Sequence, residues 1–373
     1  MREMDRVIKP TQPVMPDMDK YIKEIGAIWD TGIMTNNGDK VNRLREMLAD
    51  YMGCRNIDLF VNGHSALQIA IQALQLEGEA ITSPFTFVST TNAIIQNGLT
   101  PVFGDIDDTY NLSVESIEEL VTDRTSVIIT PHIFGIPCNV EGIEEVAVKH
   151  NLKVIYDGAQ AFGTKIRGKS IGCFGDVTMF SFHAIKIFNS IEGGMLSYKN
   201  MKLQRTFELY RNFGISYGEM GTDVEVVGMN AKMNEFQAAM GIVNLPGLDD
   251  EIKKRKGLAE AYCECLKDVT GVQTYPYDAD IDYNYAYFPV RITKDYGISR
   301  DELWLRLKEK GIGTRKLYDK LTCDYSCYQG TEYRRNSQYA DKIKGMALDL
   351  PIYGTLSETD VAYICNEMKT LGA

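Results

Sequence analysis

The residue types best suited to chemistry lie at the ends of two predicted strands. An almost wholly apolar run over 152–156 ends on Asp157, and a second strand, over 176–182, is soon followed by Lys186. A lysine acts as an amine nucleophile when partial burial lets its ammonium group lose a proton easily. A carboxylate that faces a pyridine nitrogen keeps this nitrogen protonated, and the ring then accepts electrons. Lys186 and Asp157 are therefore candidates for holding and activating a pyridine cofactor.

A third candidate is the turn Gly63-His64-Ser65, which joins a predicted strand over 58–62 to a predicted helix over 65–76. Backbone N–H groups at a helix N-terminus form a ready site for an anion such as phosphate. Lysine, carboxylate and anion-binding turn are the three parts needed to hold pyridoxal phosphate. Spacing alone leaves simpler interpretations open, in which Asp157 caps a helix, Lys186 is a surface lysine and the turn is one of many in α/β proteins.

Other cofactor classes find less support in the sequence. The turn after the first strand has one glycine, not the three of a dinucleotide fingerprint, and no phosphate loop ending in Gly-Lys-Ser/Thr occurs. The cysteines and the four histidines lack the spacing of a zinc site. We therefore expect no metal site, and we expect the cysteines to be free thiols.

The elements that must position these residues alternate along the first half of the chain. Short apolar runs near 79–83, 101–105, 125–130 and 152–157 predict strands, and the segments 87–97, 113–121 and 141–150 have helical patterns. This alternation is typical of a parallel sheet covered by helices, which binds ligands at the carboxyl ends of its strands. Asp157 and the turn at Gly63 are predicted to meet at that edge.

The second half of the chain has a different organisation. Strands over 176–182 and 194–198 precede a helix over 232–243, which Pro246-Gly247 breaks. The charged run 251–256 is interpreted as a solvated helix face, and a strand over 285–293 and a helix over 299–310 follow. We therefore predict a large cofactor domain over 1–248 and a small carboxyl-terminal domain over 249–373, with the segment 1–30 packing on the small domain.

Composition excludes several classes of protein. The 373 residues include 40 Lys and Arg against 51 Asp and Glu, a formal charge of −11, and 44% are apolar. This apolar fraction excludes a disordered or fibrous chain, and the acidic balance argues against nucleic acid as a partner. No apolar run approaches the roughly 18 to 20 residues needed to cross a membrane, and the N-terminus lacks a secretion signal. A cytoplasmic location is expected.

Several motifs follow one another in order along nearly the whole chain. They are Thr-Asn-Asn-Gly at 35–38, Ser-Pro-Phe-Thr-Phe at 83–87, Asp-x-Ala-Gln-Ala-Phe-Gly at 157–163, Phe-Ser-Phe-His-Ala-x-Lys at 180–186, Glu-Gly-Gly at 192–194, the stretch 228–235 and Leu-Pro-Ile-Tyr at 350–353. Together they resemble the DegT/DnrJ/EryC/StrS family of sugar aminotransferases. The resemblance implies the aspartate aminotransferase fold, fold type I: an α/β large domain with a mainly parallel seven-stranded sheet and a small α+β carboxyl-terminal domain.

The resemblance also implies a role for individual residues around pyridoxal 5'-phosphate. Lys186 is expected to bond covalently to the cofactor and to serve as the acid and base of the reaction. The residues expected to bind the cofactor are Asp157 at the ring nitrogen, Gln160 at the ring hydroxyl, Phe87 stacked on the ring, and Ser181 with the backbone at His64 and Ser65 around the phosphate. Asn230 resembles an asparagine that reaches the phosphate of the neighbouring subunit, which implies a homodimer with shared sites.

The residues expected on the substrate side are His183, Lys232 and Tyr318. His183 could instead be merely packed, and the segment around Tyr318 matches the family least well. Three positions depart from the family pattern. Gly158 replaces the usual alanine, a small change expected only to loosen packing. His64 replaces the usual threonine, so a hydroxyl contact with the phosphate is lost. Lys232 replaces an arginine found in many members, and a lysine recognises a carboxylate or phosphate with less directionality.

The expected reaction is transamination, because family members that dehydrate sugars carry histidine where this chain has Lys186. The resemblance implies glutamate as amino donor and a nucleotide-linked keto sugar as acceptor. The motifs favour conversion of dTDP-4-keto-6-deoxyglucose to dTDP-4-amino-4,6-dideoxyglucose, and a 3-keto dTDP-sugar or a UDP-linked 4-keto sugar remains an alternative. A non-catalytic regulatory relative would be expected to lose Lys186 or Asp157. A cysteine desulfurase would want histidine directly before the lysine, where Ile185 stands.

Overall fold

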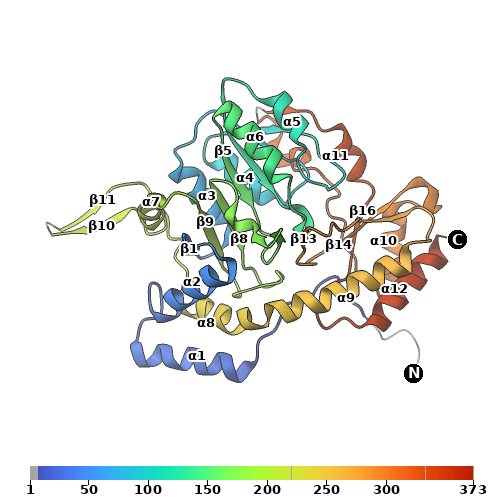
Figure 1. The fold of residues 1–373 in the computed structure, drawn as a ribbon, viewed down its shortest axis with the longest axis horizontal. Helices are drawn as coiled ribbons and strands as arrows, with labels where there is room; N and C mark the ends of the chain where they lie inside the picture. The colour runs from blue at the N-terminus through green and yellow to red at the C-terminus, as the bar shows by residue number, and fades with distance from the viewer. Residues whose placement is uncertain (1–6, 220, 332, 373) are drawn as a thin grey trace.

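The computed structural model describes residues 7–219, 221–331 and 333–372. Within these residues an eight-stranded sheet runs in the order β1-β9-β8-β5-β4-β2-β3-β15 (Figure 1). Every pair from β8 to β15 is parallel, whereas β9 is antiparallel to both β8 and β1. The strands are β1 (Ile57–Phe60), β2 (Glu79–Thr82), β3 (Thr100–Phe103), β4 (Thr125–Pro131), β5 (Lys153–Asp157), β8 (Val177–Ser181), β9 (Gly194–Tyr198) and β15 (Arg334–Arg335).

Helices bury both faces of this sheet, as a parallel sheet requires. Val127 and Ile129 of β4 face the core under α3, α4 and α7, and Ile128, on the opposite side of the same strand, packs with α5 and α6. The helices of this region are α2 (Asp39–Met52), α3 (Gly63–Ala73), α4 (Val88–Gln96), α5 (Val114–Leu120), α6 (Val140–His150) and α7 (Leu203–Tyr210). The side chains of Asn62, Ser113 and Asn139 cap α3, α5 and α6, so each helix starts at a polar residue that satisfies a free N–H.

A second core lies in the carboxyl-terminal third. The strands β12 (Val272–Thr274), β14 (Phe288–Ile292) and β16 (Ala347–Leu350) form an antiparallel sheet. It packs with the helices α9 (Leu248–Leu266), α10 (Arg300–Glu309) and α12 (Glu358–Leu371). Ile8 is 3% exposed in this core and forms a bridge to Ile312, so the start of the described chain packs here.

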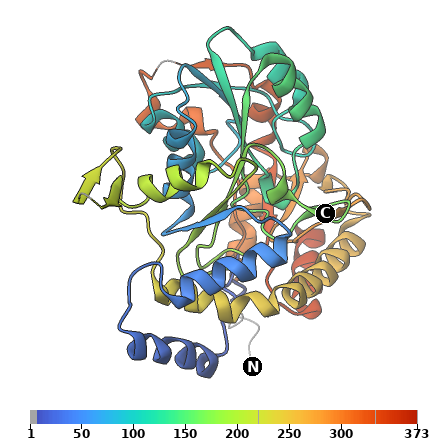
Figure 2. The same cartoon turned by 60° about the vertical axis from the view of Figure 1, so that its left-hand side comes forward.

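The remaining elements lie around these two cores. Helix α1 (Met18–Thr31) packs against α8 (Glu235–Asn244), and the hairpin of β10 (Ile215–Gly218) and β11 (Gly221–Val224) extends away from the body in both views (Figures 1 and 2). The other elements are β6 (Lys165–Ile166), β7 (Lys169–Ser170), β13 (Ile281–Asp282) and α11 (Gln338–Ile343). Of the predicted N-terminal segment 1–30, residues 1–6 lie outside the described residues, Ile8 packs in the second core, and α1 packs on α8.

The structure confirms the alternation of strands and helices, and it confirms the break at Pro246-Gly247, where a single 3-10 turn separates α8 from α9. Two expectations are corrected. The described sheet has eight strands, not seven, because β15 returns from the carboxyl-terminal third to pair with β3. The charged run at the start of α9 is not simply a solvated face, since Glu251 and Arg255 are 9% and 1% exposed and form an ion pair at 2.7 Å.

The expectation of free thiols is wrong for one pair of cysteines. Cys54, just after α2, and Cys173, between β7 and β8, form a disulfide. Among the described residues, none of the helices has both the length and the apolar character needed to span a membrane.

Candidate active site

Asp157 is the last residue of β5, and its carboxylate is held by two donors. The Thr90 hydroxyl donates to Oδ2 at 2.7 Å, and the Ala159 N–H donates to Oδ1 at 3.0 Å. Burial raises the pKa of Asp157 overall, although these two hydrogen bonds and the neighbouring Lys186 and His64 act in the opposite direction. Each oxygen therefore keeps a lone pair for a further donor, and the carboxylate lies at the ligand-binding edge of the sheet.

Lys186 lies in the loop between β8 and β9, where its backbone N–H donates to the His183 carbonyl at 2.8 Å. The half-buried lysine lines a small pocket with Gln160 and Ser181, next to the apolar side chains of Phe162 and Ile187. The structure therefore brings these three predicted residues together. Lys186 is the amine that this pocket offers as a nucleophile.

The predicted anion-binding turn adjoins this pocket at Ser181. A Cβ added to Gly63 would lie 2.9 Å from the Ser181 Cβ, so glycine permits the N-terminus of α3 to approach β8 this closely. The Ser65 N–H already donates to the Asn62 side chain at 2.8 Å. The ring of His64 contacts the Ser89 hydroxyl at 2.8 Å, which ties the side chain to α4. The N–H groups of Gly63 and His64 and the hydroxyl of Ser65 are thus the donors available for an anion.

Phe87 precedes α4 as its N-cap residue and is 63% exposed. The Thr90 N–H donates to the Phe87 carbonyl at 3.3 Å, and the Thr90 side chain in turn donates to Asp157. One helical turn therefore joins the exposed ring to the buried carboxylate. An exposed aromatic ring in this position offers a flat apolar surface to a planar ligand.

Both the oxygen and the nitrogen of the Gln160 side-chain amide form hydrogen bonds. Its Oε1 accepts the Phe134 N–H at 2.6 Å, and its Nε2 donates to the Tyr318 hydroxyl at 2.8 Å. Tyr318 is 7% exposed, and burial raises the pKa of its hydroxyl. Tyr318 therefore lies beside the pocket, although the sequence placed it with the sugar.

Two further predicted residues, Asn230 and Lys232, are absent from the lining of this pocket in the same chain. The Lys232 ammonium donates to Asn230 Oδ1 at 2.7 Å and lies 4.9 Å from the centre of the Phe213 ring. Burial and the charge of Arg211 lower the pKa of Lys232. The Asn230 side chain is exposed, so this cluster forms a separate polar surface.

His183 lies three residues before Lys186 on the same loop. Its Nε2 is 3.5 Å from Glu192 Oε1, and both side chains are about half exposed, at 44% and 52%. The ring is therefore open to a ligand and is not packed in the core. Elsewhere in the described part of the chain, no group of three or more histidine, cysteine or acidic side chains is arranged to hold a metal ion.

Sequence reasoning missed three residues of the site. Thr90 lies one helical turn after Phe87, and this spacing was the available signal. Asn62 directly before Gly63 is a typical helix N-cap residue, which could have been recognised. Phe134 contributes through its backbone alone, so its residue type gave no signal.

Comparisons with known proteins agree with this geometry. A family model described as the DegT/DnrJ/EryC1/StrS aminotransferase family matches residues 17–369. The chain is 35% identical to the dTDP-4-amino-4,6-dideoxy-D-glucose transaminase of Shigella dysenteriae, over 99% of this chain and 100% of that protein. It is 36% identical to the Escherichia coli protein of the same name, over 96% and 97% of the two chains.

Solved structures share the fold across the whole chain. The crystal structure of DesI in the presence of its TDP-sugar product has a TM-score of 0.93 at 30% identity and covers 100% of this chain and 94% of that one. Helicobacter pylori PseC, an aminotransferase of pseudaminic acid biosynthesis, has a TM-score of 0.92 at 24% identity, which shows the fold alone, over 98% of this chain and 99% of that chain. Together with the family match, these similarities show that the chain belongs to the DegT/DnrJ/EryC1/StrS aminotransferase family and is a nucleotide-sugar aminotransferase of fold type I.

Proposed function

We propose that this enzyme uses pyridoxal 5'-phosphate to transfer an amino group from glutamate to dTDP-4-keto-6-deoxyglucose, giving dTDP-4-amino-4,6-dideoxyglucose. The observation that carries the proposal is the pocket in which Lys186 meets Gln160 and Ser181 beside the buried carboxylate of Asp157. The choice of sugar follows the two relatives at 35% and 36% identity, which are named for this product.

The residues present fit the cofactor at each of its functional groups. The phosphate would lie at the N-terminus of α3, where the helix dipole is positive and Ser181 adds a hydroxyl. The ring nitrogen would face Asp157, the ring hydroxyl would face the Gln160 amide, and the ring would stack on Phe87. A solved structure of the same fold, the Streptococcus pneumoniae protein Spr1654, is described in PLP and PMP forms, which supports the assignment.

When bound, the cofactor supplies a ring that withdraws electrons from the carbon carrying the amino group. Asp157 maintains this property, because a carboxylate beside the ring nitrogen keeps a proton on it. The hydrogen bonds from Thr90 and Ala159 favour the charged form of the carboxylate and oppose the effect of burial on its pKa. Lys186 Nζ carries the proton between the reacting carbons, since it is the amine that lines the pocket. Phe162 and Ile187 exclude water from this side of the amine.

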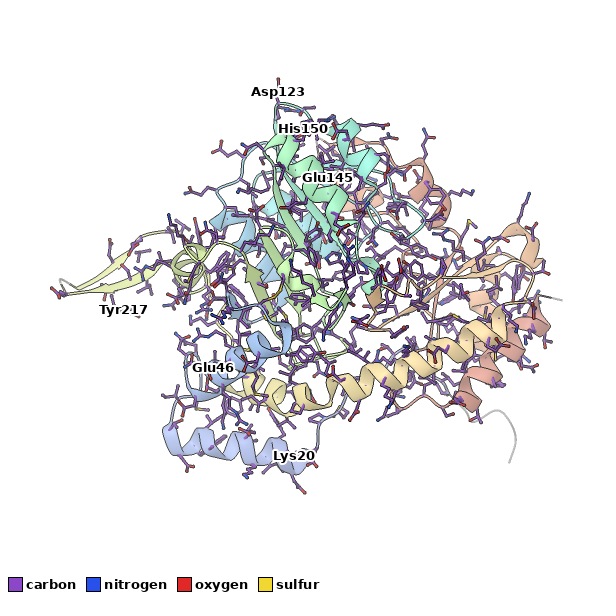
Figure 3. All side chains as sticks on the ribbon, in the orientation of Figure 1. Lys20, Glu46, Asp123, Glu145, His150 and Tyr217 are labelled. Atoms are coloured by element: carbon purple, nitrogen blue, oxygen red, sulfur yellow. A yellow bond between two sulfur atoms is a disulfide. The ribbon has the colours of Figure 1, made fainter. Side chains whose placement is uncertain are left out.

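We also propose a homodimer in which Asn230 and Lys232 complete the partner's site. Support comes from the exposed surface around them. Phe213 beside Lys232 is 47% exposed, and Tyr217, which is 77% exposed, lies on the projecting hairpin outside the body of the molecule (Figure 3). A two-stranded hairpin is at best marginally stable alone in water, so a second copy would be expected to cover this surface.

The test is a panel of keto sugars incubated with the enzyme and glutamate. The panel contains dTDP-4-keto-6-deoxyglucose, a 3-keto dTDP-sugar and a UDP-linked 4-keto sugar, and mass spectrometry and NMR identify the amino sugar. We expect product from the first, with the amine at C4. Product from only one of the others would overturn the proposed acceptor, and absence of product from all of them would overturn the proposed function.

A further inference from the structure

Two protein groups of fixed hydrogen-bonding character decide how the Gln160 amide is oriented. A backbone N–H can only donate, so the atom 2.6 Å from the Phe134 nitrogen must be the amide oxygen. The amide nitrogen therefore lies on the other side, where it donates to the Tyr318 hydroxyl at 2.8 Å. A rotation of the amide by half a turn would place its NH2 group against another donor.

The aromatic packing holds both of these groups in place. Phe134 has a left-handed backbone, with φ of 57°, and is 3% exposed. Such a conformation is uncommon for a large side chain, and it persists where the surroundings determine it. The ring of Phe85 contacts both Phe134, at 6.3 Å between ring centres, and Tyr318, at 5.3 Å. One buried ring thus supports both partners of the amide.

The donor that remains on Gln160 faces the pocket. The amide nitrogen carries two hydrogens, and Tyr318 accepts one of them. Gln160 lines the pocket together with Lys186, so the second hydrogen is available to a group bound there. Tyr318 itself is nearly buried and donates no charge to the pocket; besides Gln160, the titratable groups that act on the pKa of its hydroxyl are Tyr287, Asp157 and Arg315.

We infer that Tyr318 is a positioning residue, which together with the Phe134 backbone fixes the Gln160 amide with its donor toward the cofactor's ring hydroxyl, and that it does not bind the sugar. The inference rests on the proposed function. In this role Tyr318 acts through Gln160, which lies 158 positions away in the sequence.

The test is the pH at which the visible absorption of the bound cofactor changes in Tyr318→Phe. A hydrogen-bond donor to the cofactor's ring oxygen stabilises the negative charge of that oxygen. The effect is largest after the proton that the oxygen shares with the Lys186 nitrogen has dissociated. A less firmly held donor therefore raises the midpoint, by roughly half to one pH unit, the size expected for one hydrogen bond. Tyr328→Phe is the matched control, because Tyr328 donates its hydroxyl to Asn92 and not to Gln160. We expect no shift in this control.

A double-mutant cycle separates positioning from other effects. In a Gln160→Ala background, Tyr318→Phe is expected to produce no further shift, because it has no amide left to orient. Gln160→Glu, which leaves Tyr318 in place, provides a second variant in case Tyr318→Phe folds poorly. The glutamate carboxylate cannot donate to the ring oxygen. The midpoint of Gln160→Glu is therefore expected to rise at least as much as that of Tyr318→Phe.

Two results would overturn the inference. The first is an unchanged midpoint in Tyr318→Phe together with a raised KM for the nucleotide sugar, which would make Tyr318 a substrate-binding residue while the proposed function stands. The second is a wild-type protein that shows no visible absorption with pyridoxal phosphate, which would overturn the proposed function as well.

Discussion

At the scale of single residues, the proposed mechanism depends on keeping the buried carboxylate of Asp157 charged. Burial raises the pKa of Asp157, and a neutral acid beside the ring nitrogen would not keep this nitrogen protonated. The Thr90 hydroxyl at 2.7 Å opposes the effect of burial. Thr90 is therefore as important to the proposed mechanism as the residues that contact the cofactor.

We predict that Thr90→Val lowers turnover about tenfold to a hundredfold, because a hydrogen bond to a charged group contributes roughly 1.5–3 kcal/mol. Loss of the hydroxyl raises the pKa of Asp157 further. Since the reaction needs the ionised carboxylate, the fall in activity on the acid side should move to higher pH. A pH profile of kcat measures both effects.

Thr90→Ser is the matched control, since it keeps the hydroxyl and should restore most of the turnover. If kcat of Thr90→Val falls on the acid side at the same pH as kcat of the wild type, Thr90 does not act through Asp157.

The sequence predicted residues such as Asp157, Gln160 and Lys186 as the site because each follows a recognisable strand or motif. It could not predict the link from Tyr318 to Gln160, since the two residues are 158 positions apart and only the fold brings them together. The same holds for Thr90 and Asp157, at a separation of 67. The roles proposed for Asn230 and Lys232 need a second copy of the chain.

At the scale of elements, Glu79 at the start of β2 joins three parts of the chain. Its carboxylate accepts hydrogen bonds from Arg124 at 2.6 Å, from Arg334 of β15 at 2.7 Å and from Thr122 at 2.8 Å, and the residue is 1% exposed. Burial raises the pKa of Glu79, but the hydrogen bonds of Thr122 and Arg334 and the arginine charges outweigh it, and the pKa is lowered. The ionised form thus fastens β15 to the sheet edge.

We predict that Glu79→Gln destabilises the protein by about 1–2 kcal/mol at neutral pH, a value at the lower end because both arginines are partly exposed. A lowered pKa in the folded state means that the stabilisation is present above the pKa of unfolded glutamate, roughly 4.3, and is lost as the pH falls through the folded value. Denaturant unfolding of the wild type and the variant should therefore differ at pH 7, and the difference should shrink as the pH falls below roughly 4.3 and on through the lowered folded pKa.

Glu118→Gln provides the control, because Glu118 pairs with Lys149 and His150 on the surface. It should leave the unfolding midpoint nearly unchanged. If Glu79→Gln has an equally small effect at pH 7, the carboxylate does not hold β15 in place.

The alternation of strands and helices could be predicted because each strand is a short apolar run between turn residues. Helix α2 carries its buried residues among many charges, which conceals the apolar stripe. Strand β15 is two residues long and exists only through its pairing with β3. The disulfide of Cys54 and Cys173 joins positions separated by 119 residues, and no spacing rule indicates such a pair.

At the scale of the whole molecule, the proposed dimer makes each active site depend on two chains. Lys186 lies in the pocket, whereas Asn230 and Lys232 are absent from its lining, and the exposed Asn230 forms a bridge to Asn212. A symmetric dimer places the same surface of each copy against the other. Mixing two inactive variants tests such an arrangement without knowledge of the interface.

We predict that two inactive variants restore activity when they are mixed. Lys186→Ala removes the amine, and Asn230→Asp places a negative charge near the partner's phosphate. After exchange of subunits at equal amounts, half of the dimers are mixed and hold one native site each, so about a quarter of the wild-type activity should return. Sedimentation of the wild type should give the mass of a dimer.

The controls for this experiment are each variant mixed with itself, which should stay inactive. If mixed dimers form and stay inactive, then each site is built from one chain, and Asn230 acts on the pocket of its own subunit or on none.

The central claim is that Lys186 bonds covalently to pyridoxal phosphate, and reduction with borohydride tests it most directly. The wild-type protein, yellow after incubation with the cofactor, should lose its colour on reduction, and mass spectrometry should find the added mass on the peptide that contains Lys186. Lys186→Ala, treated in the same way, should carry no adduct. An adduct that persists in the variant, or one placed on another lysine of the wild type, would contradict the account.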